Sequence, residues 1–170
     1  KGTIIKNDKI LDYYIEDIKK DIAMNSTLKV CLDCGNGITG AIVRRVFESL
    51  NINCEIIYEE VDGSFPNHPP DPTDEKNLSE LKKSIKKNKA DIGFAYDGDG
   101  DRIVVVSKEC KVIWPDQLLI LYSKDILSKN PGGKIVYDIK CSKHVEKEIT
   151  KLSGLPILSR TGHSFIKKAM

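Results

Sequence analysis

The sequence predicts an α/β fold with a mixed, mainly parallel sheet flanked by helices, followed by the first part of a second, similar α/β domain. Short apolar runs of strand length alternate with longer segments whose apolar residues recur at helical spacing, the pattern of strand–helix–strand units. Of the 170 residues, 40% are hydrophobic, which is enough for a core. The residues from Asp116 onward are too few to close a sheet and core of their own, so we expect the second domain to be incomplete.

The N-terminal part is expected to form an amphipathic helix, then two strands joined by a second helix. Residues 9–23 place apolar side chains at helical spacing among acids and lysines. These side chains are Ile10, Leu11, Tyr14, Ile15, Ile18 and Ile22. The following elements are a strand at 28–33, a glycine-rich turn at 35–40, a helix at 41–50 and a strand at 54–59.

A proline-rich loop precedes the third helix. Residues 61–74 contain four prolines and no periodicity, which indicates a long, stiffened loop of a kind that is uncommon unless it is functional. Asp74 is placed to cap a helix at 75–88, whose buried stripe is Leu78, Leu81 and Ile85.

The rest of the chain continues the alternation of strands and helices. Asp116 is the expected N-cap of the next helix. The predicted elements are strands at 91–96, 102–107 and 111–113, a helix at 114–127, a strand at 134–139, a helix at 143–152, a strand at 155–159 and the start of a helix within 160–170. We therefore expect one domain at 1–111, with residues 1–8 as a linker, and the N-terminal part of another at 112–170.

Composition and charge argue against several classes of protein. Lysine and arginine total 27 against 25 aspartates and glutamates, and the lysines are scattered along helical segments, so we expect no nucleic-acid binding. No apolar run reaches the roughly 18 residues that a membrane-spanning helix needs, and the N-terminus lacks the apolar core of a signal peptide. We expect no membrane association and a cytoplasmic protein.

The five cysteines do not resemble a disulfide framework. Cys31 and Cys34 form a C-x-x-C motif, but Cys31 lies inside an apolar strand, whereas a redox motif would open a helix. A zinc site would need a second such pair or two histidines. Both cysteines are therefore predicted to be structural.

The stretch "AYDGDGDR" carries the main chemical signal. Asp97, Asp99 and Asp101 alternate with glycines at the end of an apolar strand. Two carboxylates about 5 Å apart repel by roughly 3 kcal/mol at an effective dielectric of about 20, so three together need a cation. Carboxylates without histidine or cysteine favour a hard divalent ion, Mg²⁺ before Mn²⁺ or Ca²⁺.

Residues next to the three aspartates indicate which kind of metal site they could form. If Asp97 opened an EF-hand loop, the sixth position would be Arg102 instead of glycine and the twelfth Lys108 instead of glutamate, which excludes that motif. A guanidinium beside a carboxylate-held metal suits phosphoryl transfer, although Arg102 could also form an ion pair with one of the aspartates. The turn at 35–40 could cradle a phosphate, but its spacing favours a packing role. His68 is expected to buttress the metal site.

These residues resemble a known family. "DGDGDR" after a strand is similar to the metal loop of the α-D-phosphohexomutases, and the likeness is greatest to the bacterial phosphomannomutase/phosphoglucomutase branch. Five further stretches agree in order and cover nearly the whole chain: "VCLDCGNGITG", "VDGSFPNHPPDPT", "VIWPDQLL", "VYDIKCSKHV" and "SRTGHSFIKK". The resemblance implies the second domain of such an enzyme, at 1–111, and the start of its third, at 112–170.

The resemblance also implies an activity and a site. Such enzymes are isomerases that move a phosphoryl group between the 1- and 6-positions of mannose or glucose, through a phosphoserine and a bisphosphate intermediate. By position, Asp97, Asp99 and Asp101 are the Mg²⁺ ligands and the catalytic Arg102 lies near the phosphoryl group. Lys140 and His163 match positions that contact the phosphohexose substrate, mannose or glucose 1- or 6-phosphate.

Parts of the family pattern are missing from these residues. No T-A-S-H-N-P-like stretch supplies the phosphoserine, and no G-E-M-S-G-H-like sugar loop is present, so we expect the chain to be inactive without the other domains of its parent. Two alternatives are a non-catalytic Mg²⁺- or Ca²⁺-binding α/β module and a haloacid-dehalogenase-like phosphatase. The latter needs D-x-D-x-T/V at the first strand, whereas here the fifth residue is Asp101, after a late strand.

Overall fold

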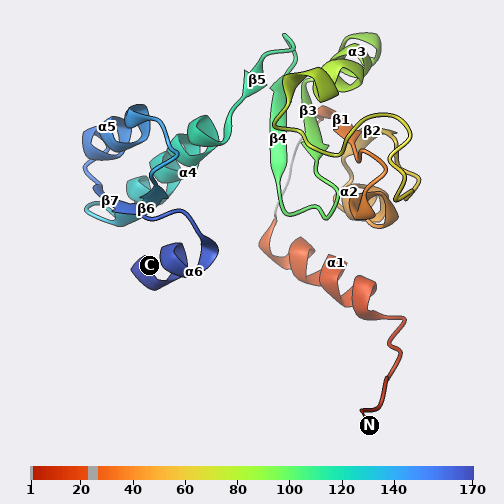
Figure 1. Cartoon of the computed structure of the whole chain (residues 1–170), viewed down its shortest axis with the longest axis horizontal. Coiled ribbons are helices and arrows are strands. Elements are labelled where there is room, and N and C mark those ends of the chain that lie inside the picture. The colour runs from red at the N-terminus through yellow and green to blue at the C-terminus, as the bar shows by residue number, and fades with distance from the viewer. Residues whose placement is uncertain (1, 23–26) are drawn as a thin grey trace. The chain divides into compact units, whose positions relative to one another are not determined.

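A computed structural model describes residues 2–22 and 27–170, which form two compact units (Figure 1). The first unit runs to Val112 and the second begins at Ile113. Within the described residues, no helix combines the length and the apolar character needed to cross a membrane.

The first unit is built on a mixed sheet with the strand order β2-β1-β3-β4-β5. β1 pairs in parallel with β2 and β3, whereas β4 is antiparallel to β3, so the predicted mixed, mainly parallel sheet is confirmed. The strands are β1 (Lys29–Asp33), β2 (Asn53–Ile57), β3 (Ile92–Tyr96), β4 (Ile103–Ser107) and β5 (Val112–Ile113). Asp33 pairs with Ile57 on one side and Ala95 on the other, so the carboxyl ends of β1, β2 and β3 share one edge.

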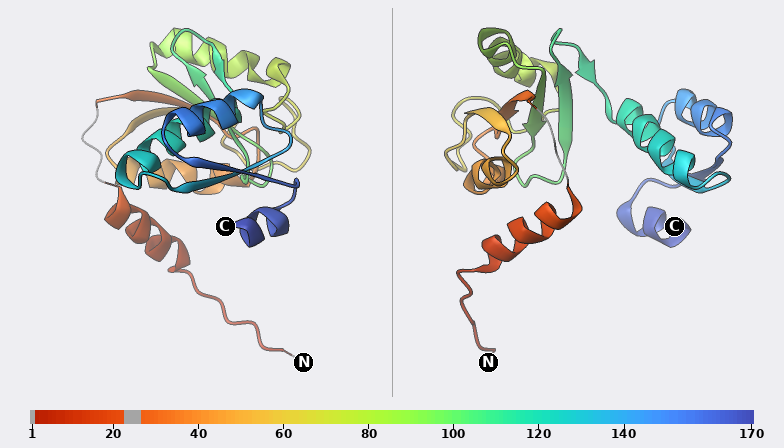
Figure 2. Two further views of the ribbon diagram at one scale, coloured as in Figure 1. Left: turned by 90° about the vertical axis from the view of Figure 1, so that its left-hand side faces the viewer. Right: turned by 180° about the vertical axis from the view of Figure 1, so that it is seen from behind.

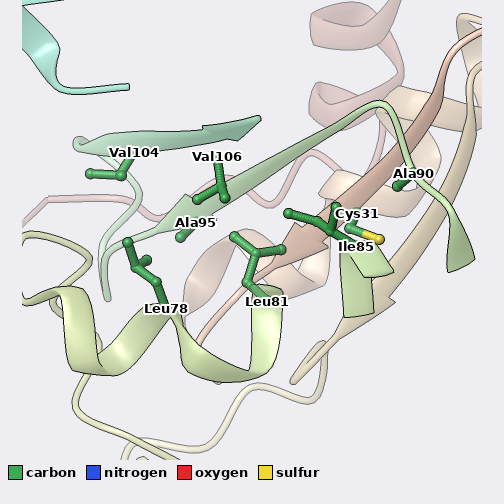
Figure 3. Close-up of a cluster of buried hydrophobic side chains, with 8 residues drawn as sticks. All are labelled: Cys31, Leu78, Leu81, Ile85, Ala90, Ala95, Val104 and Val106. Carbon is green, nitrogen blue, oxygen red and sulfur yellow. The ribbon is translucent and has the colours of Figure 1, made fainter. Parts of the chain in front are cut away.

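Helices cover both faces of this sheet (Figure 2). On one face, the 3-10 turn η2 (Glu75–Leu78) and α3 (Ser79–Asn88) bury the predicted stripe of Leu78, Leu81 and Ile85, each 1% exposed or less. Figure 3 shows Leu78 and Leu81 facing strand residues of the same cluster. The Asp74 carboxylate accepts a hydrogen bond from the Lys76 N–H at 3.0 Å, which confirms the predicted cap.

The opposite face packs against α2 (Val43–Ser49), which follows the 3-10 turn η1 (Ile38–Ala41). Successive residues of a strand point to opposite faces, so Cys31 joins the cluster under α3 while Val30 and Leu32 join Val43 under α2. The strand alternation therefore produces two cores, one on each side of β1.

The N-terminal helix α1 (Ile10–Asp21) forms as predicted, but most of its apolar stripe is exposed. Ile15 is buried, whereas Ile10 is 65% and Tyr14 52% exposed. The predicted end of this helix at residue 23 lies outside the described residues. Asp12 pairs with Arg45 of α2, so a charged contact adds to the small buried area of this helix.

The second unit contains one parallel strand pair, β6 (Lys134–Asp138) with β7 (Leu155–Ser159). Its helices are α4 (Pro115–Lys129), α5 (Lys143–Lys151) and α6 (His163–Ala169). The hydrophobic core of the described part of this unit consists of Leu127, Ile135, Tyr137, Val145 and Ile149. This strand–helix–strand unit matches the elements predicted from the sequence.

The predicted N-cap of α4, Asp116, is wrong. Trp114 occupies the cap, its N–H donating to the Gln117 Oε1 at 2.9 Å, and Pro115 is the first helical residue. Proline favours this first position because it has no N–H to satisfy. Asp116 lies within the first turn and instead accepts the Ser142 N–H at 2.6 Å, which joins α4 to the start of α5.

Candidate metal centre

The three predicted metal ligands lie together in the loop between β3 and β4. Each of Asp97, Asp99 and Asp101 offers a carboxylate oxygen, and these oxygens lie within 4.8 Å of one another. Asp97 is 2% exposed, whereas the other two are exposed. The turn closes through the Gly100 N–H, which donates to the Asp97 carbonyl at 3.2 Å, and Gly100 has a φ of 75°, which glycine adopts without strain.

The ionisation of these carboxyls reflects their crowding. Burial opposes the charge on Asp97, but hydrogen bonds from the Arg102 backbone and guanidinium outweigh it and lower the pKa. Repulsion from the Asp99 charge and the contact with Asp97 raise the pKa of Asp101. A cation among the three groups would relieve this repulsion. The all-oxygen donor set fits a hard divalent ion such as Mg²⁺.

Arg102 is hydrogen-bonded to two carboxylates, and the Asp101 Oδ1 lies 3.8 Å from its Nε. Its Nε donates to the Asp97 Oδ2 at 2.6 Å, and its Nη1 donates to the Asp71 Oδ1 at 3.1 Å. The ion pair considered as an alternative for this arginine is therefore present. Two partners fix the plane of a guanidinium, and the side chain stays 52% exposed beside the aspartate loop.

The glycine-rich turn packs directly on the aspartate loop. The Ile38 N–H donates to the Gly98 carbonyl at 3.0 Å, and a methyl group added at Gly37 would lie 2.7 Å from that same oxygen. A methyl group added at Gly100 would lie 2.5 Å from the Thr39 Cγ2. These contacts favour the packing interpretation of the turn over a phosphate cradle.

The proline-rich loop covers another side of the aspartate loop. A methyl group at Gly98 would lie 3.3 Å from Pro70 and 3.6 Å from Phe65. His68 contacts the buried Asp33 through Nε2, at 3.2 Å from Oδ2, which agrees with a buttressing role. Asp71, the partner of Arg102, belongs to this loop.

Sequence reasoning missed Asp33 and Asp71 as neighbours of the site. Asp33 ends β1 at the same sheet edge as the aspartate loop, so its position after an apolar strand was an available signal. Asp71 is separated from Arg102 by 31 residues, and no spacing rule connects a loop residue with a partner that distant.

The two predicted substrate-binding residues lie in the second unit. Lys140 follows β6 and His163 begins α6 after β7. Since β6 and β7 are parallel, with Asp138 opposite Ser159, both residues follow the carboxyl edge of the same strand pair. Arg160 lies at this edge too, with its guanidinium 4.3 Å above the Phe165 ring. Contact of Lys140 and His163 with a substrate stays a prediction.

The buried cysteines are expected to resist thiol reagents. Cys31 is 1% and Cys34 0% exposed, and burial raises the pKa of Cys34 to about 12. At pH 8 nearly every Cys34 would therefore be a thiol, whereas the thiolate is the reactive form. Alkylation with iodoacetamide followed by peptide mass spectrometry should modify both residues in urea and neither in the native chain. Rapid modification of native Cys34 would contradict the structural role.

Comparisons with known proteins place these features in a family. Residues 12–110 match the family profile described as phosphoglucomutase/phosphomannomutase, alpha/beta/alpha domain II, and residues 114–170 match the profile for domain III. A phosphomannomutase/phosphoglucomutase of Pseudomonas aeruginosa strain PAO1 is 46% identical over 161 residues, which is 95% of this chain and 35% of that protein.

Further relatives extend this likeness to structure. The phosphomannomutase/phosphoglucomutase of Pseudomonas syringae pv. tomato is 46% identical over 172 residues, covering 100% of this chain and 36% of that protein. A crystal structure of a phosphoglucomutase/phosphomannomutase family protein from Burkholderia thailandensis superposes with a TM-score of 0.90 at 40% identity, over 94% of this chain and 35% of that one. The chain thus spans about a third of the length of the curated relatives it matches.

Proposed function

Because the chain belongs to the phosphoglucomutase/phosphomannomutase family, as its resemblance to the α-D-phosphohexomutases predicted, we propose that it forms the metal-binding part of a phosphosugar mutase. In this proposal residues 1–111 are domain II, with 1–8 as a linker, and residues 112–170 are the first part of domain III. The parent enzyme transfers a phosphoryl group between the 1- and 6-positions of mannose or glucose. The observation that carries the proposal is the three-carboxylate cluster with Arg102 held beside it.

The aspartate loop is proposed to hold Mg²⁺. Asp97, Asp99 and Asp101 would supply one oxygen each, and Asp97 would be the most rigid ligand because it is buried at a strand end. A bound Mg²⁺ supplies positive charge beside a phosphoryl group, which lowers the cost of the charge that develops during transfer. The loop itself contributes a fixed arrangement of oxygens, because Gly98 and Gly100 are packed against neighbouring residues.

Arg102 is proposed to stabilise the charge on the phosphoryl group. A guanidinium presents several N–H donors in one plane, and the pairs with Asp97 and Asp71 fix that plane.

Lys140 and His163 are proposed to bind the phosphohexose, since they follow the carboxyl ends of parallel strands, where α/β sheets usually present ligand groups. The other domains of the parent would supply the phosphoserine, and a cytoplasmic location stays a prediction.

A chimeric enzyme would test this function. Residues 12–170 of this chain would replace the equivalent segment of the Pseudomonas aeruginosa phosphomannomutase/phosphoglucomutase, to which the chain is 46% identical. We expect the chimera to convert glucose 1-phosphate to glucose 6-phosphate in the presence of Mg²⁺, measured by a coupled dehydrogenase assay. The Asp97→Asn chimera should lose this activity, because it lacks the buried ligand.

The controls separate failure of folding from failure of the proposal. The Asp125→Asn chimera carries the same change of charge at an exposed side chain of the second unit and should remain active. The isolated chain, expected to be inactive, gives the baseline. A chimera that unfolds cooperatively but shows no Mg²⁺-dependent turnover would contradict the proposed function.

A further inference from the structure

His68 lies between two hydrogen-bond acceptors. Its Nδ1 is 2.8 Å from the Pro69 carbonyl oxygen, and its Nε2 is 3.2 Å and 3.3 Å from the two oxygens of Asp33. A neutral imidazole carries one N–H and can donate to only one of these partners. The imidazolium donates to both. The geometry therefore favours the doubly protonated ring.

Asp33 gives an independent reason for the same charge state. Its side chain is 1% exposed, at the carboxyl end of β1, and its Oδ1 also accepts the Gly35 N–H at 2.9 Å. A buried carboxylate is costly unless a cation pairs with it. Among the described residues, Asp33 forms its ion pair with His68. Deprotonating His68 would leave this buried charge without its counter-ion.

An aromatic ring and a second carboxylate also act on His68. The Tyr58 ring, which follows β2, meets the imidazole edge-on at a centroid distance of 5.4 Å, and the Glu80 carboxylate of α3 acts on it electrostatically. The hydrogen bond to Asp33, opposed by burial and assisted by the Pro69 carbonyl and by the Asp33 and Glu80 charges, raises the pKa of His68 above its ordinary value of 6.5. Burial raises the pKa of the Tyr58 phenol, and the charge of Lys83 acts on that phenol in the opposite direction.

The pair of His68 and Asp33 joins the proline-rich loop to the sheet. The loop begins where the Asp62 N–H donates to the Asn36 carbonyl at 3.0 Å, and Asn67 donates to the Asn36 side chain at 2.7 Å. Beyond His68, the same loop carries Asp71, which pairs with Arg102. The attachment at His68 therefore stands between the anchored start of the loop and its contact with the candidate site.

We propose that His68 is a positioning residue, whose imidazolium ties the proline-rich loop to Asp33 and thereby keeps Asp71 against Arg102. Loss of the ring proton removes one hydrogen bond and the counter-ion of Asp33, so the loop loosens around residues 67–71. The effect on Arg102 rests on the proposed function, whereas the proton-dependent attachment of the loop does not.

The direction of the pH dependence follows from the sign of the shift. A group whose pKa is raised in the folded state stabilises that state fully below its unfolded pKa and loses this contribution as pH rises through the folded pKa. The loop should therefore be attached firmly at mildly acidic pH. It should loosen as pH rises above the ordinary histidine range.

An NMR titration of the 170-residue chain tests this proposal without metal or substrate. The imidazole resonance of His68, assigned by its absence in His68→Gln, should titrate with a midpoint above 6.5. The amide resonances of Phe65 and Asp71 should shift with the same midpoint, and their protection from hydrogen exchange should be lost above it. His144→Gln, the same substitution at the exposed start of α5, should leave the response of these amides unchanged.

Asp33→Asn provides a second variant that keeps the shape of the partner. It should lower the midpoint of His68, because the hydrogen-bonded charge is gone, and it keeps the proposal testable if His68→Gln does not fold. A His68 midpoint at or below 6.5 in the wild-type chain would overturn the proposal. So would amides of the loop that do not follow the titration of His68. A titrating loop in a chain whose chimera is inactive would support this attachment while contradicting the proposed function.

Discussion

Replacing Asp97 with asparagine is expected to weaken divalent-cation binding by about tenfold or more, which corresponds to about 1.4 kcal/mol of binding free energy. Asp97 is the buried member of the carboxylate cluster, so its oxygens are held by the fold, whereas Asp99 and Asp101 are exposed. Asparagine keeps an oxygen to accept the Arg102 backbone N–H, but its NH₂ group cannot accept the Arg102 Nε–H as Oδ2 does. The loss should therefore come from the missing charge together with the weaker attachment of Arg102. Titration with Mn²⁺ followed by electron paramagnetic resonance measures the free ion directly.

Asp125→Asn is the matched control for this experiment. Its carboxylate is 65% exposed and pairs with Lys129 on α4, so the substitution changes the net charge equally at a place remote in sequence from the aspartate loop. We expect the Mn²⁺ affinity to stay at the wild-type level. If both variants weakened Mn²⁺ binding equally, the cause would be the change in the net charge of the chain and not the loss of a ligand. Wild-type affinity in Asp97→Asn would remove Asp97 from the ligand set.

Local sequence signals were sufficient for most of the fold. The alternation of strands and helices, the stripe of Leu78, Leu81 and Ile85, and the cap by Asp74 all depend on neighbours within one or two turns, and the structure contains each of them. Asp116 was misplaced because both it and Trp114–Pro115 are compatible with a helix start. Pro115 favours the earlier start because proline suits the first helical position, and Asp116 instead accepts the Ser142 N–H, 26 residues away.

The candidate site shows more clearly that local sequence patterns do not predict contacts between residues far apart in the chain. The three aspartates could be recognised because they alternate within five residues, and repulsion between them demands a cation. The partners that position the site come from other elements: Asp71 reaches Arg102 across 31 residues, and His68 reaches Asp33 across 35. Such contacts depend on how the loop folds back over the sheet edge, which no local pattern determines.

An apolar stripe likewise does not identify what covers it. The helix α1 was predicted from Ile10, Tyr14 and their neighbours, and it forms, yet Ile15 is its buried residue. Helical periodicity reports which side chains share a face, whereas burial depends on a surface that another element must provide. The periodicity of residues 9–23 therefore predicted the secondary structure correctly and said little about packing.

Gly40→Ala is expected to destabilise the first unit by about 3 kcal/mol or more. A methyl group at this buried position would lie 1.9 Å from the Glu59 carbonyl oxygen and 2.8 Å from its carbon, so backbone would have to move. That backbone is held on both sides, because the Tyr58 carbonyl accepts the Asn36 N–H at 2.9 Å and the Glu60 carbonyl accepts the Asn36 side chain at 2.8 Å. Urea unfolding, followed through the amide signals of β1 and β3, measures the effect on this unit alone.

Gly63→Ala is the matched control, since a methyl group there meets nothing within 4 Å. It should leave the free energy of unfolding unchanged or raise it by about 0.4–1 kcal/mol through the less flexible unfolded chain. A Gly40→Ala chain within about 0.5 kcal/mol of wild type would contradict the packing described for the glycine-rich turn.

Gly37→Ala then links the turn to the metal centre, because its methyl group would press on Gly98 between two candidate ligands. If the turn supports the aspartate loop, Gly37→Ala should weaken Mn²⁺ binding, whereas Gly63→Ala should leave the Mn²⁺ affinity unchanged. If the turn served only as a phosphate cradle, Gly37→Ala would leave the Mn²⁺ affinity unchanged too.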